Sequence, residues 1–347
     1  MPSIAQTTVE MVQFVFPEHA GAPGQIHGGR MMQWITQAGT MAAARVARGT
    51  VVLGATDDID FLHPVKIGDI AILRAQVEYV GRSSLEVGVR VWGEDVATGE
   101  RTVTLNSHLV YVSVGEDAHP RPVGRTIEPR GPAEAEVVET ARQRRERRLA
   151  RFARKTVPAS SSLSQSGDPS GPDLAGPGDH VTTFESVRTV LPEDALFGNM
   201  MFSGKMLMDI DEAGGILSMR YCRGFVMTAC LDAMDFYSPI FTHEVVTFKA
   251  ALNYVGTSSM EVGVKVLAER PWAGEVRHAC TAFLTYVHLE AGGPTGDRAA
   301  WRPQRVPAFG PRTAAEQRRW DEAVVRRELR LDRVKRLRAA LQNEQRG

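Results

Sequence analysis

The chain carries the same run of residues twice, at one constant spacing. The segment GRSSLEVGVRV, residues 81–91, matches GTSSMEVGVKV, residues 256–266, which lies 175 positions further on. FLHPV at 61–65 matches FYSPI at 236–240 at the same offset. Solenoid repeats are only about 20–50 residues long, so an offset of this size indicates one fold unit that occurs twice. We therefore expect two copies of one domain, called here the first and the second unit.

The remaining composition fits two ordinary globular domains in a reducing compartment. The chain of 347 residues has 41 basic and 41 acidic side chains, so its net charge gives no attraction to nucleic acid or to an anionic membrane. It has no run of about 18 apolar residues, and MPSIAQTTVEMVQFVF lacks the basic start of a signal peptide. The cysteines Cys222, Cys230 and Cys280 have no paired spacing. We expect a cytoplasmic protein that binds neither nucleic acid nor a membrane.

Changes in composition divide the chain into five segments. Each unit contains one stretch of good helix formers followed by alternating, β-branched strand segments, which predicts an α+β fold. A charged helical segment follows each unit, and the Ser-, Gly-, Pro- and Asp-rich stretch between the units is typical of a flexible linker. The predicted limits are a first domain at 8–115, a charged helical extension at 116–154, a linker at 155–180, a second domain at 181–290 and a charged helical extension at 291–347.

Two charged clusters lie outside the repeated segments. The first helical extension carries a row of basic residues between 142 and 155, which we interpret as a solvated face of a helix that packs through a thin apolar stripe. No interleaving of aromatic residues and no nucleic-acid-binding motif accompanies it. Asp57, Asp58 and Asp60 could suggest a metal site, but strand alternation places neighbouring residues on opposite faces. We expect no metal site.

Taken together, the ordered motifs resemble acyl-CoA thioesterases of the tandem (double) hotdog type. The segments that carry this resemblance are PEHAGAPGQIHGGRMMQWITQAG in the first unit and PEDALFGNMMFSGKMLMDIDEAGG in the second, together with the repeated strand-turn-strand pieces. The resemblance implies two hotdog domains, each a long central helix wrapped by an antiparallel β-sheet. It also implies that acyl-CoA lies between the two units and that chains assemble as a homo-oligomer, a trimer of double-hotdog chains.

In this family an active site combines a carboxylate on one central helix with the loop before the partner unit's helix, which usually carries an asparagine. The carboxylate falls on Asp211, whereas the equivalent residue of the first unit is Thr36. The loop asparagine falls on Gly21, and in the second unit on Leu196. The resemblance thus implies one site built on Asp211, and a second, degenerate site with Thr36, Asn199 and Gly204.

Thioester hydrolysis needs a base or nucleophile and donors for the developing oxyanion. Asp211 on a buried helix fits the first role, and the backbone N–H groups of Gly28 and Gly29 at a helix start fit the second. Gln25 or His27 could replace the missing asparagine, beside Gly21. Structural interpretations remain open, since Asp211 could face solvent and His27 could be a loop histidine bonded to backbone. Four serines either shape turns or line the substrate crevice: Ser83, Ser84, Ser258 and Ser259.

The predicted activity is hydrolysis of a fatty acyl-CoA to free acid and CoA, without a metal or another cofactor. The absence of Asn at position 21 and of an acid at position 36 leaves a second hypothesis open, a catalytically weak or inactive acyl-CoA binding or sensing module. A hotdog hydratase acting on enoyl thioesters ranks last, because the helix of the first unit offers no acid. No Gly-x-Ser-x-Gly segment supports a serine hydrolase.

Overall fold

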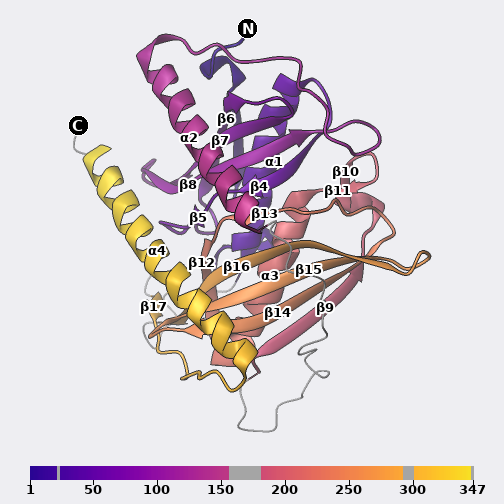
Figure 1. The fold of residues 1–347 in the computed structure, drawn as a ribbon. Helices are drawn as coiled ribbons and strands as arrows, with labels where there is room; N and C mark the ends of the chain where they lie inside the picture. Colours follow the sequence, from indigo (N-terminus) through magenta and orange to yellow (C-terminus); the bar gives the residue numbers. More distant parts are fainter. Residues whose placement is uncertain (22–23, 156–180, 292–300, 345–347) are drawn as a thin grey trace.

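A computed structural model describes residues 1–21, 24–155, 181–291 and 301–344 (Figure 1). Apart from Lys155, the predicted linker at 155–180 lies outside the described residues. The predicted limits of the two domains stay a prediction, although the elements of each unit fall in the same order.

The first unit contains a long helix, α1, and a set of antiparallel strands, and a second helix, α2, follows it. Its elements are η1 Ala5–Thr7, β1 Val9–Phe14, η2 Pro17–His19, β2 Ala20–Gly21, β3 Gln25–Ile26, α1 Gly28–Ala47, β4 Val51–Thr56, β5 Ile59–Asp60, β6 Ile70–Val80, β7 Ser84–Glu94, β8 Arg101–Ser113 and α2 Gly131–Lys155.

The second unit repeats this order and is followed by the helix α4. Its elements are β9 Thr183–Thr189, η3 Pro192–Asp194, β10 Ala195–Phe197, β11 Met200–Met201, α3 Ser203–Cys222, β12 Phe225–Leu231, β13 Met234–Asp235, β14 Val245–Val255, β15 Ser259–Arg270, β16 Glu275–Ala291, β17 Trp301–Pro303 and α4 Ala314–Glu344. The helices α1 and α3 begin and end 175 residues apart, at the offset of the sequence repeat.

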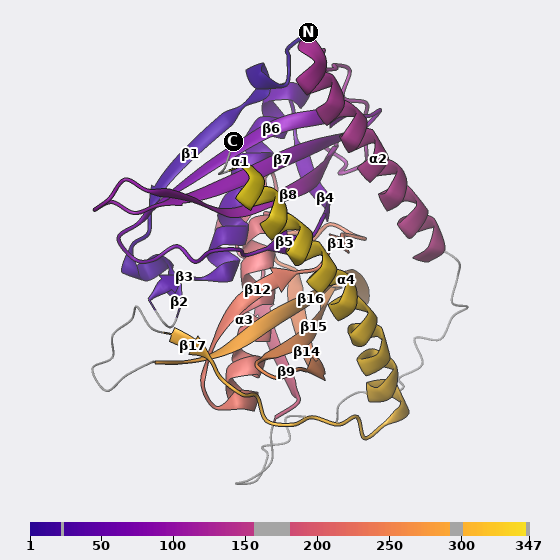
Figure 2. The same ribbon diagram turned by 90° about the vertical axis from the view of Figure 1, so that its left-hand side faces the viewer.

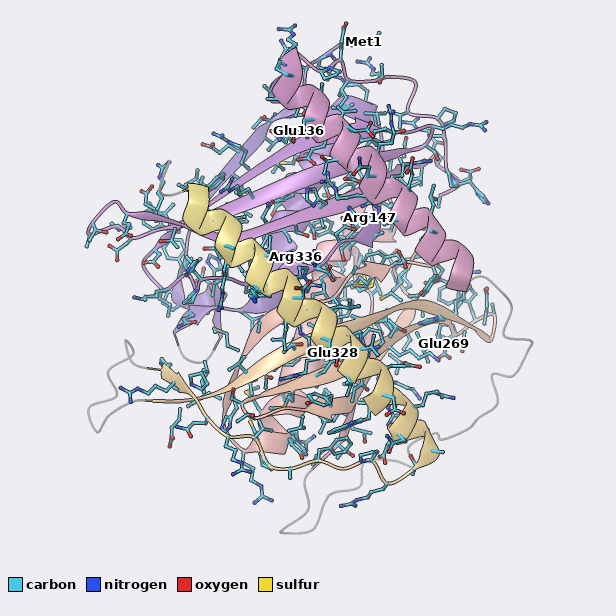
Figure 3. All side chains as sticks on the ribbon, turned by 60° about the vertical axis from the view of Figure 1, so that its left-hand side comes forward. Met1, Glu136, Arg147, Glu269, Glu328 and Arg336 are labelled. Carbon is cyan, nitrogen blue, oxygen red and sulfur yellow. The ribbon has the colours of Figure 1, made fainter. Side chains whose placement is uncertain are left out.

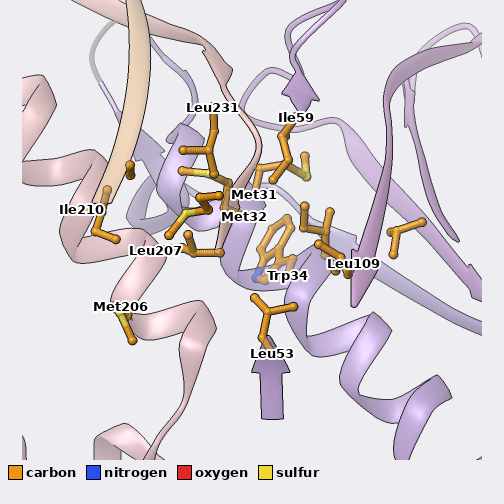
Figure 4. Packing of buried hydrophobic residues seen from close by; sticks show 14 of the residues in the cluster. Met31, Met32, Trp34, Leu53, Ile59, Leu109, Met206, Leu207, Ile210 and Leu231 are labelled. Carbon is orange, nitrogen blue, oxygen red and sulfur yellow. The ribbon is translucent and has the colours of Figure 1, made fainter. Parts of the chain in front are cut away.

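Each central helix is buried because apolar residues occur around most of its circumference. In α1, Met31, Met32 and Ile35 are fully buried, and in α3 Leu207 and Ile210 are. Figure 4 shows that methionine and leucine side chains from both helices fill the space where α1 and α3 pack together. The core is therefore continuous from one unit to the other.

The two sheets exchange short strands at the seam between the units. The first sheet has the order β1-β6-β7-β8-β4-β13, and the second has the order β5-β12-β16-β15-β14-β9, with β17 beside β16. β13 of the second unit pairs with β4, and β5 of the first unit pairs with β12. Figures 1 and 2 show the resulting arrangement, in which each sheet wraps its own central helix. The α+β double-hotdog prediction is thus confirmed.

The helices α2 and α4 lie across the outer faces of the sheets (Figure 3), and several of their arginines form ion pairs with acidic residues of those sheets. In α2, Arg144 forms 2.6 Å ion pairs with Glu78 and Glu86, which are buried in the first sheet. In α4, Arg326 forms a 2.6 Å ion pair with the buried Glu261. The prediction of a solvated basic face is therefore wrong for these arginines, because acidic residues on the sheets attract them.

The aspartates Asp57, Asp58 and Asp60 form ion pairs with arginines of α2 and α4. Arg148 of α2 pairs with Asp57 at 3.0 Å. Arg333 of α4 pairs with Asp58 at 2.9 Å and with Asp60 at 2.7 Å, although it belongs to the helix that follows the second unit. The described residues contain no group of His, Cys, Asp and Glu that could hold a metal ion, and none of their helices has the length and apolar character needed to cross a membrane.

Candidate functional site

Asp211 lies on α3 at the seam, and donors from both units surround its carboxylate. Its side chain is 1% exposed. Oδ2 accepts a 2.6 Å hydrogen bond from the backbone N–H of Gly29, in the other unit. Oδ1 accepts hydrogen bonds from the hydroxyls of Thr228 at 2.7 Å and Tyr286 at 3.1 Å. A buried carboxylate is stable only when it is hydrogen-bonded in this way, so the three donors account for its burial.

The opposing side of the site is the N-terminus of α1, whose first N–H groups have no partners within the helix. His27 caps this helix, since its Nδ1 accepts a 3.1 Å hydrogen bond from the Gly29 N–H. The same Nδ1 lies 3.4 Å from Asp211 Oδ2. The His27 side chain is 32% exposed, so solvent reaches the site on this side. The partial positive charge of the helix start further favours an anion here.

Gly28 and Gly29 allow the helix start to approach Asp211 closely. A Cβ on Gly28 would lie 2.6 Å from Thr228 Oγ1, and a Cβ on Gly29 would lie 2.9 Å from the Met208 Cα. Neither distance is possible without a shift of the backbone or of a buried side chain. The two glycines are thus required by the close approach that brings the Gly29 N–H to the carboxylate.

The loop before α1 has no asparagine at position 21, but a different carboxamide lies nearby. In the short β2–β3 pair, Gly21 is directly opposite Gln25, so side chains at both positions share one face. A Cβ on Gly21 would lie 3.3 Å from His27 Cδ2, so this face also carries the imidazole. Gln25 Oε1 is buried and accepts no hydrogen bond from the described residues. Gln25 therefore has an amide group available beside the position of the missing asparagine.

The pseudo-equivalent location in the other half of the seam is apolar. Thr36 replaces Asp211, and its hydroxyl donates to the carbonyl of Met32 within α1. Leu53 takes the place of Thr228, and Phe202 takes the place of His27. The Phe202 ring covers Gly204, since a Cβ there would lie 2.6 Å from Cε1.

The space that remains at this second location is a cavity of only about 20 Å³. Asn199 contributes its backbone carbonyl to a hydrogen bond with the Thr242 N–H, and does not line that cavity. Of the second-site residues, Thr36 and Gly204 lie on the two central helices, where α1 and α3 pack together.

Ser83 and Ser258 lie in the turns before β7 and β15, and Ser84 and Ser259 are the first residues of those strands. Gly81 donates its N–H to the Ser84 carbonyl, and Gly256 donates to the Ser259 carbonyl in the matching turn. The carbonyls of Ser83 and Ser258 accept hydrogen bonds from the strands that follow. None of the four is hydrogen-bonded to Asp211, His27 or the two glycines within the described residues. Their role in substrate binding stays a prediction.

Sequence reasoning missed Thr228 and Tyr286, the two hydroxyl donors. Thr228 is a polar residue on a mostly apolar strand, and its counterpart in the first unit is Leu53. The two copies differ at this position as they also differ at Asp211 and Thr36. This paired difference was a sequence signal that Thr228 belongs to the site of Asp211. Tyr286 gave no such signal, since Tyr111 stands at the same place in the first unit.

Comparisons with known proteins agree with the duplicated architecture. The profile of the Thioesterase superfamily matches residues 23–100 and 198–271, one segment in each unit. The cytosolic acyl coenzyme A thioester hydrolase of Mus musculus is 26% identical over 324 residues, which are 90% of this chain and 81% of that protein.

A single-unit relative and a solved structure complete the comparison. Protein VdlD of Helicobacter pylori is 36% identical over 141 residues, 41% of this chain and 76% of its own length. An acyl-ACP thioesterase structure from Bacteroides thetaiotaomicron has a TM-score of 0.50 at 12% identity, covers 82% of this chain and 99% of that one, and indicates the same fold.

Proposed function

The chain belongs to the thioesterase superfamily, and on this premise we propose that it is an acyl-CoA thioesterase that hydrolyses a fatty acyl-CoA to the free acid and CoA. The observation that carries this proposal is the 2.6 Å contact between Asp211 Oδ2 and the Gly29 N–H, because it joins a carboxylate of one unit to a helix start of the other. The curated relative that aligns with 90% of the chain is named as an acyl coenzyme A thioester hydrolase.

In the proposed reaction Asp211 acts as the general base. A water oxygen adds to the thioester carbonyl carbon while a water proton passes to Asp211 Oδ2. The developing oxyanion is stabilised by the Gly28 N–H, which has no acceptor among the described residues. When the carbon–sulfur bond breaks, the proton on Asp211 passes to the sulfur, so that free acid and CoA leave and the carboxylate is restored.

His27 and Gln25 complete the proposed site on the side that solvent reaches. The His27 imidazole, 3.4 Å from Asp211 Oδ2, orients the water or the thioester. The Gln25 carboxamide takes over the polar contact that the family's loop asparagine makes, since its oxygen has no other partner among the described residues. The proposed site is asymmetric, with one catalytic location per chain.

A panel of acyl-CoA substrates from short to long chain tests this function, with release of the CoA thiol as the readout. We expect Asp211→Asn to lower kcat about 10²–10⁴-fold, the range that a general base contributes. Thr36→Ala, at the pseudo-equivalent position, is the matched control and should stay within about twofold of the wild type. Unchanged activity in Asp211→Asn would remove Asp211 from the mechanism, and no CoA release from any substrate would reject the function.

We further propose that three chains assemble into a ring and that the protein acts in the cytoplasm. β1 and β9 are the outermost strands of the two sheets, and both carry exposed apolar side chains. Val12 on β1 and Phe16 just after it are 56% and 51% exposed, and the equivalents Val187 on β9 and Leu191 just after it are 57% and 46% exposed. Exposed apolar edges favour association, and contact between two different edges can close a ring. The mouse relative is named as cytosolic.

A further inference from the structure

Tyr286, on β16 of the second unit, contacts the catalytic carboxylate. Its side chain is 1% exposed, and its hydroxyl lies 3.1 Å from Asp211 Oδ1 and 2.9 Å from the Asp211 backbone carbonyl. Gly214 makes room for it, because a Cβ there would lie 2.3 Å from the hydroxyl oxygen. Such a buried hydroxyl needs an acceptor, and the carbonyl alone would provide one.

The first unit contains the same tyrosine without the carboxylate. The Tyr111 hydroxyl donates to the Thr36 carbonyl at 2.9 Å, and a Cβ on Gly39 would lie 2.5 Å from it. The bond from tyrosine to helix carbonyl is therefore common to both units. In the second unit the Tyr286 hydroxyl also contacts the Asp211 side chain. The first unit has Thr36 at that position and therefore has no carboxylate there.

The Tyr286 hydroxyl remains a donor at every pH at which an enzyme works. Burial raises the pKa of Tyr286 well above its usual range, and the neighbouring Asp211 carboxylate raises it further. Burial likewise raises the pKa of Tyr111. Neither phenol is available to give up its proton, so any effect of Tyr286 on catalysis comes from hydrogen bonding.

We propose that Tyr286 is a positioning residue that, together with Thr228, holds Asp211 Oδ1 so that Oδ2 faces the Gly29 N–H and the substrate; this rests on the proposed thioesterase function. With two hydroxyls on Oδ1, the carboxylate cannot rotate about its last bond without losing both.

Tyr286→Phe and Tyr111→Phe form a matched pair, because each removes one buried bond to a helix carbonyl. We expect Tyr111→Phe to keep kcat and KM within about twofold of the wild type. Tyr286→Phe should lower kcat about tenfold, as expected for a bond to a charged group, with KM unchanged.

A readout that does not depend on turnover separates this proposal from the proposed function. In protein labelled with ¹³C-aspartate, the Asp211 carboxyl signal is the one that disappears in Asp211→Asn. We expect its chemical shift to differ from the wild type in Tyr286→Phe and to stay unchanged in Tyr111→Phe, even if the wild type releases no CoA. Equal changes of this signal in the two variants overturn the positioning role, and so do equal kcat values in an active enzyme.

A second pair of variants covers the case in which Tyr286→Phe does not fold. Gly214→Ala displaces the Tyr286 hydroxyl and Gly39→Ala displaces that of Tyr111, with Cβ positions 2.3 and 2.5 Å from the respective oxygens. We expect only Gly214→Ala to lower kcat and to change the chemical shift of the Asp211 carboxyl carbon. Equal effects of both glycine variants would contradict the proposal.

Discussion

At the scale of single residues, the site depends on the donors around one buried carboxylate. A carboxylate that is 1% exposed loses its hydration, and only the bonds from Gly29, Thr228 and Tyr286 compensate for this loss. Of these partners Gly29 could be inferred from sequence, because the repeat and the resemblance indicate a contact between a helix acid and the opposite loop. Of the two hydroxyls, that of Thr228 left a signal, because Leu53 stands at its place in the first unit. The contact from Tyr286 could not be inferred, because which strand residues face the helix depends on strand register.

Thr228→Val tests the importance of the hydroxyl in nearly the same volume. Loss of the 2.7 Å bond to Oδ1 should lower kcat/KM about tenfold, because a hydrogen bond to a charged group is being removed. Thr228→Ser keeps the hydroxyl and should recover most of the activity, as measured by CoA release. If the serine variant were as impaired as the valine variant, packing of the Thr228 methyl group would be responsible rather than its hydroxyl.

At the scale of secondary-structure elements, the sequence repeat predicted the long helices and strands. It did not predict the short strands that link the two sheets or the ion pairs between the outer helices and the sheets. The 20-residue helices α1 and α3 follow from runs of good helix formers. The two-residue strands β5 and β13, which link the sheets, are too short to give a periodic pattern. The inward direction of the α2 and α4 arginines also depends on acids far away in sequence, such as Glu78 and Asp60.

The helix α4 is expected to hold the two units together through Arg333. Asp60, its partner in the first unit, is 4% exposed, so Arg333→Ala leaves a buried carboxylate without its cation. We expect a loss of about 2 kcal/mol in the free energy of unfolding, measured with urea, because unpaired buried charges are costly. Arg336→Ala removes an exposed pair with Asp332 in the same helix and should change stability by less than about 0.5 kcal/mol.

Equal stability of the Arg333 and Arg336 variants would contradict this role of α4. The comparison is controlled for helix propensity, because both changes replace arginine by alanine within one helix. A large loss confined to Arg333→Ala would instead confirm that the helix after the second unit stabilises the first.

At the scale of the whole molecule, one duplication accounts for both the similarity and the difference of the two halves. The offset of 175 residues is kept by the central helices, by the tyrosines that bond to them and by the apolar edge positions. The two locations at the seam have diverged, with Asp211, Thr228 and His27 at one and Thr36, Leu53 and Phe202 at the other. Sequence comparison of the copies revealed the loss of the acid but not the closure of the space by Phe202.

The proposed trimer predicts a defined mass in solution. Light scattering should give the mass of three chains for the wild type, and the double variant Val12→Glu/Val187→Glu should give a single chain of 38.0 kDa, because charge on the apolar edges opposes association. Val325→Glu changes an equally exposed residue on α4 and should leave the assembly intact. A single-chain mass for the wild type would reject the ring.

The central claim is that one catalytic location per chain is formed where the α1 start of the first unit meets Asp211 of the second. The most direct test is kcat/KM for acyl-CoA in Gly29→Ala compared with Gly204→Ala, the same change at pseudo-equivalent helix starts. Because a Cβ on Gly29 forces α1 away from Asp211, we expect a loss of about 10²-fold or more in Gly29→Ala, and less than about threefold in Gly204→Ala. Equal losses in the two variants, or a larger loss in Gly204→Ala, would contradict the account.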